Sequence, residues 1–112
     1  MTDLTFEQYQ KESRSTDLYA NVGDGLLMHC LGLTGEVGEL AEKIKKVIRN
    51  QERVFDETNL PGIEKELGDI LWYLAQIATD LDLRLGVAAT KNREKLLDRQ
   101  KREVIKSVGD ER

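Results

Sequence analysis

The sequence predicts an all-α protein, an antiparallel bundle of about four helices. Apolar residues recur at spacings of three and four along most of the chain, as on one face of a helix. No segment alternates between polar and apolar residues for long enough to form a convincing strand. A length of 112 residues with 39% apolar content also predicts one small domain that spans residues 1–112.

The first predicted helix follows a capping box, in which Thr5 is the N-cap and Gln8 stands three residues later. This helix is expected to end between Ser13 and Thr16. Residues 17–24 include the run Asn-Val-Gly-Asp and predict a loop.

The second and third predicted helices carry the clearest apolar stripes. The second runs from about Gly25 to Asn50, and the third begins near Pro61, which suits a first helical turn after a cap at Asn59 or Leu60. The two stripes are Leu33, Val37, Leu40, Ile44 and Val47, and then Ile63, Leu67, Ile70, Leu74, Ile77 and Leu81.

A tight turn at residues 80–82 is predicted to lead into a fourth helix, from about Leu83 to Val104. The tail from Ser107 to Arg112 is expected to fray. Aromatic residues make up only 5% of the chain and charged residues 34%, so the core is predicted to be thin and self-association is expected.

The charge and the chain start indicate where the protein acts. A net charge of −4 disfavours general binding to nucleic acids or anionic membranes. The start of the sequence has no basic segment before an apolar run, and no stretch approaches the roughly 18 apolar residues of a membrane span. Cys30 is the only cysteine. These features favour the cytoplasm.

Two pairs of acidic residues are the main functional signal. Glu36 and Glu39 are three residues apart, as are Glu66 and Asp69, so each pair lies on one face of its helix. At 100° per residue the members of each pair lie about 60° and about 120° from the centre of the apolar stripe, with the same sense on both helices. When the two stripes pack, four carboxylates are expected to meet at the rim of the core, where their repulsion calls for a cation.

Carboxylates without histidine or cysteine favour Mg²⁺ or Mn²⁺ over zinc or copper. A di-iron bundle usually needs Glu-x-x-His pairs. The only histidine, His29, precedes both acidic pairs and is expected to be structural.

The acidic pairs also have an ordinary alternative, a solvated helix face. Glycines argue against it, because each glycine in a helix costs roughly 1 kcal/mol relative to alanine. Close helix packing, access for a ligand or a break in the helix would explain the four glycines Gly32, Gly35, Gly38 and Gly68.

The last predicted helix carries a polar stripe that suits phosphate oxygens. It consists of Asn92, Lys95, Arg99 and Arg102, spaced by three and four, and its alternative is again a solvated face. Tyr73 lies one turn after Asp69 and is a candidate ligand contact. Trp72 points away from the stripe and suits an oligomer interface or stacking on a base.

The segments GLTGEVGELAE at residues 32–42 and ELGDILWYL at residues 66–74 are familiar as a pair. Over about residues 6–99 the chain resembles the MazG-like nucleotide pyrophosphohydrolases of the all-α NTP pyrophosphatase superfamily. The chain has one domain of this type, unlike a two-domain relative with a regulatory role.

The resemblance implies an enzyme that hydrolyses an NTP or dNTP to the monophosphate and pyrophosphate, in nucleotide-pool clearing. It implies Mg²⁺, with Mn²⁺ as a substitute, held by Glu36, Glu39, Glu66 and Asp69. Glu36 and Glu39 are the catalytic candidates, with one glutamate, such as Glu36, acting on the attacking water. The implied substrate contacts are Tyr73, Asn92, Lys95 and Arg99.

The resemblance also implies a homodimer or homotetramer whose active sites are completed between subunits. Two alternatives remain open at this point. One is a non-catalytic helical module that binds metal or another protein. The other is phosphoribosyl-ATP as the substrate, although the GLTGE context fits the MazG-like branch better.

Overall fold

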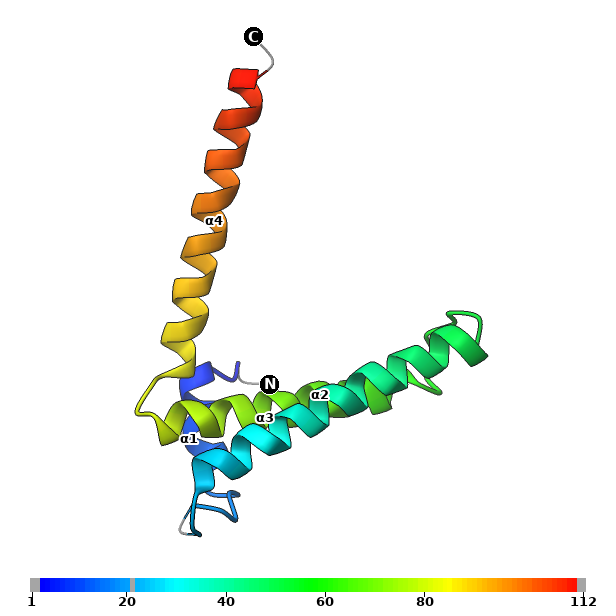
Figure 1. Cartoon of the computed structure of the whole chain (residues 1–112), viewed down its shortest axis with the longest axis vertical. Helices are drawn as coiled ribbons and strands as arrows, with labels where there is room; N and C mark the ends of the chain where they lie inside the picture. Colours follow the sequence, from blue (N-terminus) through cyan, green and yellow to red (C-terminus); the bar gives the residue numbers. More distant parts are fainter. Residues whose placement is uncertain (1–2, 21, 111–112) are drawn as a thin grey trace.

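Four helices and no strands form the part of the chain that the computed structural model describes, residues 3–20 and 22–110, with side chains as far as Val104 (Figure 1). The all-α prediction is confirmed. The helices are α1 (Phe6–Arg14), α2 (Gly25–Asn50), α3 (Leu60–Asp80) and α4 (Leu85–Asp110). The long helices α2 and α3 lie side by side and antiparallel, and α1 packs on α3 near the start of α2.

The predicted starts of the first three helices are confirmed by their caps. Thr5 Oγ1 accepts a hydrogen bond from the backbone N–H of Gln8 (3.1 Å), and the Gln8 side chain accepts one from the Thr5 N–H (3.2 Å), which completes the capping box. Asp24 caps α2 by accepting from the Leu27 N–H at 3.2 Å. Asn59 precedes α3, with Pro61 in the first turn. Local sequence therefore determines where these helices begin.

The fourth helix differs most from the prediction. The turn after α3 is present, with Asp82 at a φ of 56° and the Leu83 N–H bonded to the Ala78 carbonyl at 2.7 Å. That bond keeps Leu83 outside the next helix, so α4 begins two residues late, at Leu85. It then continues to Asp110, which corrects the frayed tail predicted from Ser107; Glu111 and Arg112 lie outside the described residues.

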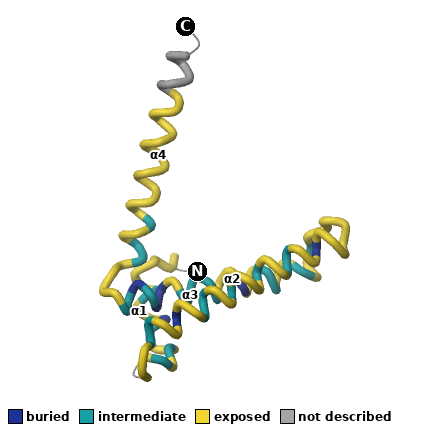
Figure 2. Tube along the Cα trace, in the orientation of Figure 1, coloured by how far each residue is buried: buried dark blue, intermediate teal, exposed yellow. Residues whose placement is uncertain are grey.

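Helix α4 extends away from the α2–α3 pair and contacts α1 and α3 only near its own start (Figure 1). Beyond this start its described side chains are exposed (Figure 2). Within the described ranges, none of the helices is both long and apolar enough to cross a membrane.

The helix faces that pack between α2 and α3 are not centred on the predicted apolar stripes. Both helices are rotated so that acidic residues lie closer to the interface. Val37 and Leu67 are about half exposed, at 47% and 54%, whereas Glu66 is only 2% exposed. The expected placement of the acids at the rim is therefore wrong for Glu66, which lies inside the helix interface. Polar side chains take up much of this interior, and the largest fully buried ones are His29, Gln76 and Glu66.

A buried polar network joins the loop before α2 to the end of α3. The His29 ring is fully buried, with Nε2 2.9 Å from Asp17 Oδ1 and Nδ1 2.5 Å from Asp80 Oδ2. Arg14 of α1 donates to the other oxygen of Asp80 at 2.8 Å. Both ring nitrogens have carboxylate partners, so the structure favours the doubly protonated imidazolium. His29 is structural, as expected.

Trp72 belongs to the same region and is half-buried in a single chain. Its Nε1 donates to Thr16 Oγ1 at 2.8 Å, and its ring lies edge-on to His29 with the centroids 5.9 Å apart. The indole therefore packs within its own chain, on the loop that follows α1.

The network predicts a pH dependence of the free energy of unfolding. Burial lowers the pKa of His29, but the hydrogen bonds and charges of Asp17 and Asp80 outweigh it and leave the pKa raised. The protonated His29 therefore makes its full contribution to the free energy of unfolding below about pH 6.5, the pKa of histidine in the unfolded chain. This contribution is lost as the pH rises through the higher pKa that His29 has in the folded protein. Burial raises the pKa of Asp80, but hydrogen bonds from His29 and Arg14 leave it lowered, so its contribution is lost as the pH falls through that lowered pKa.

Urea unfolding of wild type and His29→Gln between pH 4 and pH 9 checks this prediction. The stability difference between the two proteins is expected to be largest near pH 5–6 and to shrink as the solution becomes alkaline. A difference that does not change between pH 6 and pH 9 would contradict the imidazolium assignment.

Candidate functional site

Three carboxylates from α2 and α3 converge midway along the helix pair. Glu36 and Glu39 lie one turn apart on α2, and Glu66 faces them from the first half of α3. One oxygen from each carboxylate lies within 4.8 Å of the other two. The exposure of the three side chains differs, because Glu66 is buried, Glu36 half-buried and Glu39 exposed. The cluster therefore has a closed inner side and an open outer side.

Glu36 and Glu66, the two less exposed carboxylates, each have one oxygen without a hydrogen-bond partner in the described part of the chain. Glu36 Oε2 and Glu66 Oε2 are both buried without a hydrogen bond from the described residues. A hydrogen bond from the protonated Glu36 carboxyl to Glu66, burial, and the charges of Glu39, Glu66 and Asp69 raise the pKa of Glu36 to about 7. The same hydrogen bond, and a second one from Lys43, lower the pKa of Glu66. Glu36 therefore holds a proton more readily than an ordinary carboxyl group does, and Glu66 less readily.

The residues of this cluster fit a hard divalent cation. Mg²⁺ and Mn²⁺ take oxygen ligands, and three carboxylates with open lone pairs supply them without nitrogen or sulfur. The two unpartnered buried oxygens are costly unless a proton or a cation joins them.

Asp69, the fourth predicted ligand, lies beside the cluster but outside the group of three. Its side chain is 41% exposed and lies 3.8 Å from Lys65 Nζ, one turn earlier on α3. Its charge still contributes to the raised pKa values of Glu36 and Tyr73. The structure therefore brings three predicted ligands together and places the fourth next to them.

Tyr73 lies on the same side of the helix pair as the carboxylates. Its ring covers Gly32 of α2, where a Cβ would lie 2.3 Å from the Tyr73 Cε1 atom. Close packing thus explains Gly32, whereas Gly35, Gly38 and Gly68 face open space. Burial, followed by the charge of Glu36, raises the pKa of Tyr73, which places its hydroxyl among negative groups.

The predicted substrate contacts on α4 are far from this cluster within one chain. Asn92, Lys95 and Arg99 are all exposed, on the part of α4 that extends away from the other helices (Figures 1 and 2). Arg102 pairs with Asp98 on its own helix at 3.1 Å, as expected for a solvated face. No contact joins α4 to α2 among the described residues.

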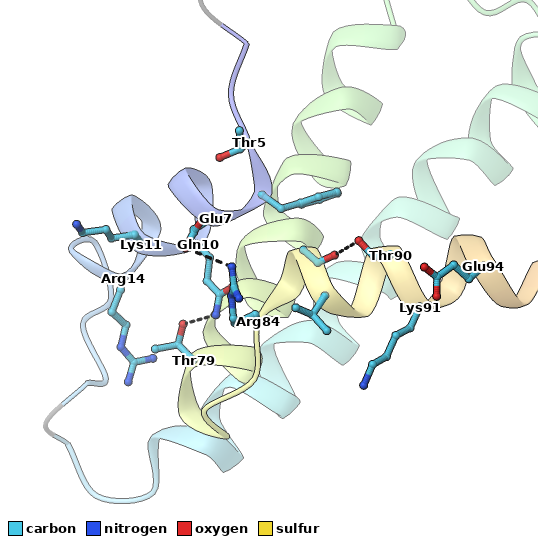
Figure 3. A pocket seen from close by; sticks show the side chains of 13 residues that line it. Thr5, Glu7, Gln10, Lys11, Arg14, Thr79, Arg84, Thr90, Lys91 and Glu94 are labelled. Carbon is cyan, nitrogen blue, oxygen red and sulfur yellow. Dashed lines mark hydrogen bonds and ion pairs between the residues drawn. The ribbon is translucent and has the colours of Figure 1, made fainter.

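A hollow of about 1030 Å³ lies elsewhere, in the angle between α1 and the first turns of α4 (Figure 3). Gln10 holds this corner together by donating to Thr79 Oγ1 at 3.0 Å and to the Leu83 carbonyl at 2.9 Å, while its own oxygen accepts from the Leu85 N–H. None of the clustered carboxylates lines this space. The hollow therefore reflects how α4 leaves the fold rather than the chemistry of the site.

Two contacts of the site escaped the sequence reasoning. Lys43 Nζ donates to Glu66 Oε1 at 2.7 Å. Its position seven residues after Glu36, on the same helix face, was an available signal. Tyr9 of α1 is affected by the charge of Asp69, which together with burial, the larger cause, raises the pKa of its hydroxyl.

Comparison with known proteins finds one matching family and a related phage protein. The MazG nucleotide pyrophosphohydrolase domain, as a family model, matches residues 17–104. The Gene 37 protein of Mycobacterium phage L5 is 39% identical over 109 residues, which cover 93% of this chain and 96% of that protein. No solved structure matches significantly.

Proposed function

Because the chain belongs to the MazG nucleotide pyrophosphohydrolase family, we propose that it is an Mg²⁺-dependent hydrolase of nucleoside triphosphates. It cleaves an NTP or dNTP between the α and β phosphates and releases the nucleoside monophosphate and pyrophosphate. The observation that carries this proposal is the convergence of Glu36, Glu39 and Glu66, whose oxygens lie within 4.8 Å of one another. Mn²⁺ is expected to substitute for Mg²⁺.

Each acidic residue has a distinct place in the proposed mechanism. Glu36, Glu39 and Glu66 hold the cation, and Asp69 completes the set from the next turn of α3. When bound, Mg²⁺ supplies positive charge for the phosphate oxygens of the substrate and of the leaving pyrophosphate. Glu36 also takes the proton of the attacking water, a role for which it is placed on the half-buried side of the cluster. Tyr73 borders the nucleotide.

A screen for pyrophosphate release tests the function. The full chain is incubated with ribo-, deoxyribo- and damaged nucleotides, with Mg²⁺ or Mn²⁺ and in parallel with EDTA. We expect turnover of at least one nucleotide, and none in EDTA. A non-catalytic module would show no turnover, and its melting temperature would not rise with Mg²⁺ and a non-hydrolysable triphosphate.

Three exposed leucines of α3, and Leu81 directly after it, support assembly with a second copy. They recur every seven residues and are from 39% to 54% exposed: Leu60, Leu67, Leu74 and Leu81. A seven-residue repeat of this kind, with isoleucines between the leucines, is typical of the seam of packed helices. We propose a homodimer or homotetramer in the cytoplasm, where nucleotide pools are cleared.

Charged side chains on this seam are expected to separate the subunits. The double variant Leu67→Glu and Leu74→Glu should elute as a monomer, whereas wild type and Leu18→Glu should elute as a dimer or tetramer, as measured by light scattering. Leu18 is a matched control, since it is 84% exposed in the loop after α1. An unchanged mass in the double variant would contradict this seam.

A second copy would also bring α4 to the carboxylates. We propose that Asn92, Lys95 and Arg99 of one subunit bind the phosphates held by the carboxylates of another. Glu39→Gln and the double variant Asn92→Ala, Lys95→Ala should each be inactive alone. After unfolding and refolding together in equal amounts, they should regain about a quarter of wild-type activity, because half of the random dimers are mixed and have one intact site. Mixed dimers without activity would contradict sharing of the site.

A further inference from the structure

Lys43 is the cation nearest to the carboxylate cluster in the described part of the chain. It extends from α2 to α3, where its Nζ lies 2.7 Å from Glu66 Oε1. The two partners differ in exposure, because the Glu66 side chain is 3% exposed and the Lys43 side chain 41%. The carboxylate is thus fixed in the interior, while the ammonium is at the open edge.

The contact satisfies only one side of Glu66. Oε1 accepts from Lys43, whereas Oε2 is buried without a partner. A buried carboxylate needs a neighbouring positive charge, and before a metal arrives Lys43 provides it.

A divalent cation among the three carboxylates would lie close to this ammonium. The cation and the ammonium would repel each other, and this repulsion is stronger at a partly buried site than in bulk water. Lys43 has a flexible stem and is partly exposed, so its ammonium can move into solvent, whereas Glu66 cannot.

We propose that Lys43 is the internal counterion of the metal-free site and that it gives up Glu66 when the divalent cation binds. This inference rests on the metal site of the proposed function and adds a residue that sets the metal affinity. Lys43 keeps the buried carboxylate paired in the absence of metal, and it weakens metal binding because its ammonium places a second positive charge on the same carboxylate.

Calorimetric titration of the full chain with Mn²⁺ alone, without nucleotide, tests the proposal. Lys43→Met removes the competing ammonium, and Lys43→Gln does so while retaining an amide donor for Glu66 should the methionine variant fail to fold. Both are expected to bind Mn²⁺ about tenfold more tightly than wild type, as for the loss of one charge-assisted hydrogen bond. Lys46→Met, which removes the same charge from an exposed position one turn further along α2, should stay within about twofold of wild type.

The outcomes separate this inference from the function on which it rests. If wild type binds Mn²⁺ and both Lys43 variants bind it no more tightly than Lys46→Met, the counterion role is wrong and the metal site stands. If wild type does not bind Mn²⁺ at all, the metal site is wrong, and the inference falls with it.

Discussion

Replacing Glu66 with glutamine is expected to lower the rate of pyrophosphate release by at least about 100-fold, since even the loss of a group that only orients a metal ligand typically costs 10–100-fold. The substitution keeps the size of the side chain and removes its charge. Glu66 is the innermost carboxylate and faces Glu36, Glu39 and Lys43, so no exposed group can replace it. Glu39→Gln and Asp69→Asn are expected to lose activity in the same way.

Glu64→Gln is the matched control for this prediction. Glu64 is on the same helix but exposed, so its loss should leave the rate within about twofold of wild type. Circular dichroism should show that Glu66→Gln keeps its helices. A folded Glu66→Gln protein with full activity would remove Glu66 from the site.

Replacing His29 with alanine is expected to reduce the free energy of unfolding by about 3–5 kcal/mol, the range for removing one partner of a buried ion pair. The imidazole is fully buried between Asp17 and Asp80, and without it the two carboxylates face a cavity. Arg14 still pairs with Asp80 at 2.8 Å but lies 3.5 Å from Asp17, so it compensates only in part.

Urea unfolding near pH 6 measures this loss, and Cys30→Ala provides the control. Cys30 is the next residue of α2 and is exposed, so its replacement should change stability by less than about 0.5 kcal/mol. Equal stability of the two variants would show that the network contributes little to the fold.

The sequence predicted the starts of the first three helices and both acidic pairs because these depend on neighbouring residues. The cap at Thr5 involves a partner three residues away, and so does the pairing of Glu36 with Glu39 on one helix face. Interactions of this range can be read from spacing alone. The bounds of α2 follow from the same kind of signal.

The packing of the helices depends on partners that spacing does not reveal. The stripe rule assumes that the interior is apolar, but Glu66 and His29 are buried here because Lys43 and two aspartates reach them from other parts of the chain. The packed face therefore turned toward the acids and left Leu67 exposed. The direction of α4 depends in turn on the hydrogen bonds of Leu83 and Gln10. These bonds also cannot be predicted from the spacing of residues along one helix.

Phosphorus NMR of the reaction products shows which phosphate bond the protein cleaves and whether Glu66 is needed for it. The full chain is incubated with Mg²⁺ and the best nucleotide of the screen, and a second sample contains Glu66→Gln. We expect pyrophosphate and the nucleoside monophosphate in equal amounts with wild type, and unchanged triphosphate with the variant. Release of orthophosphate with the nucleoside diphosphate, or equal turnover by both proteins, would contradict it.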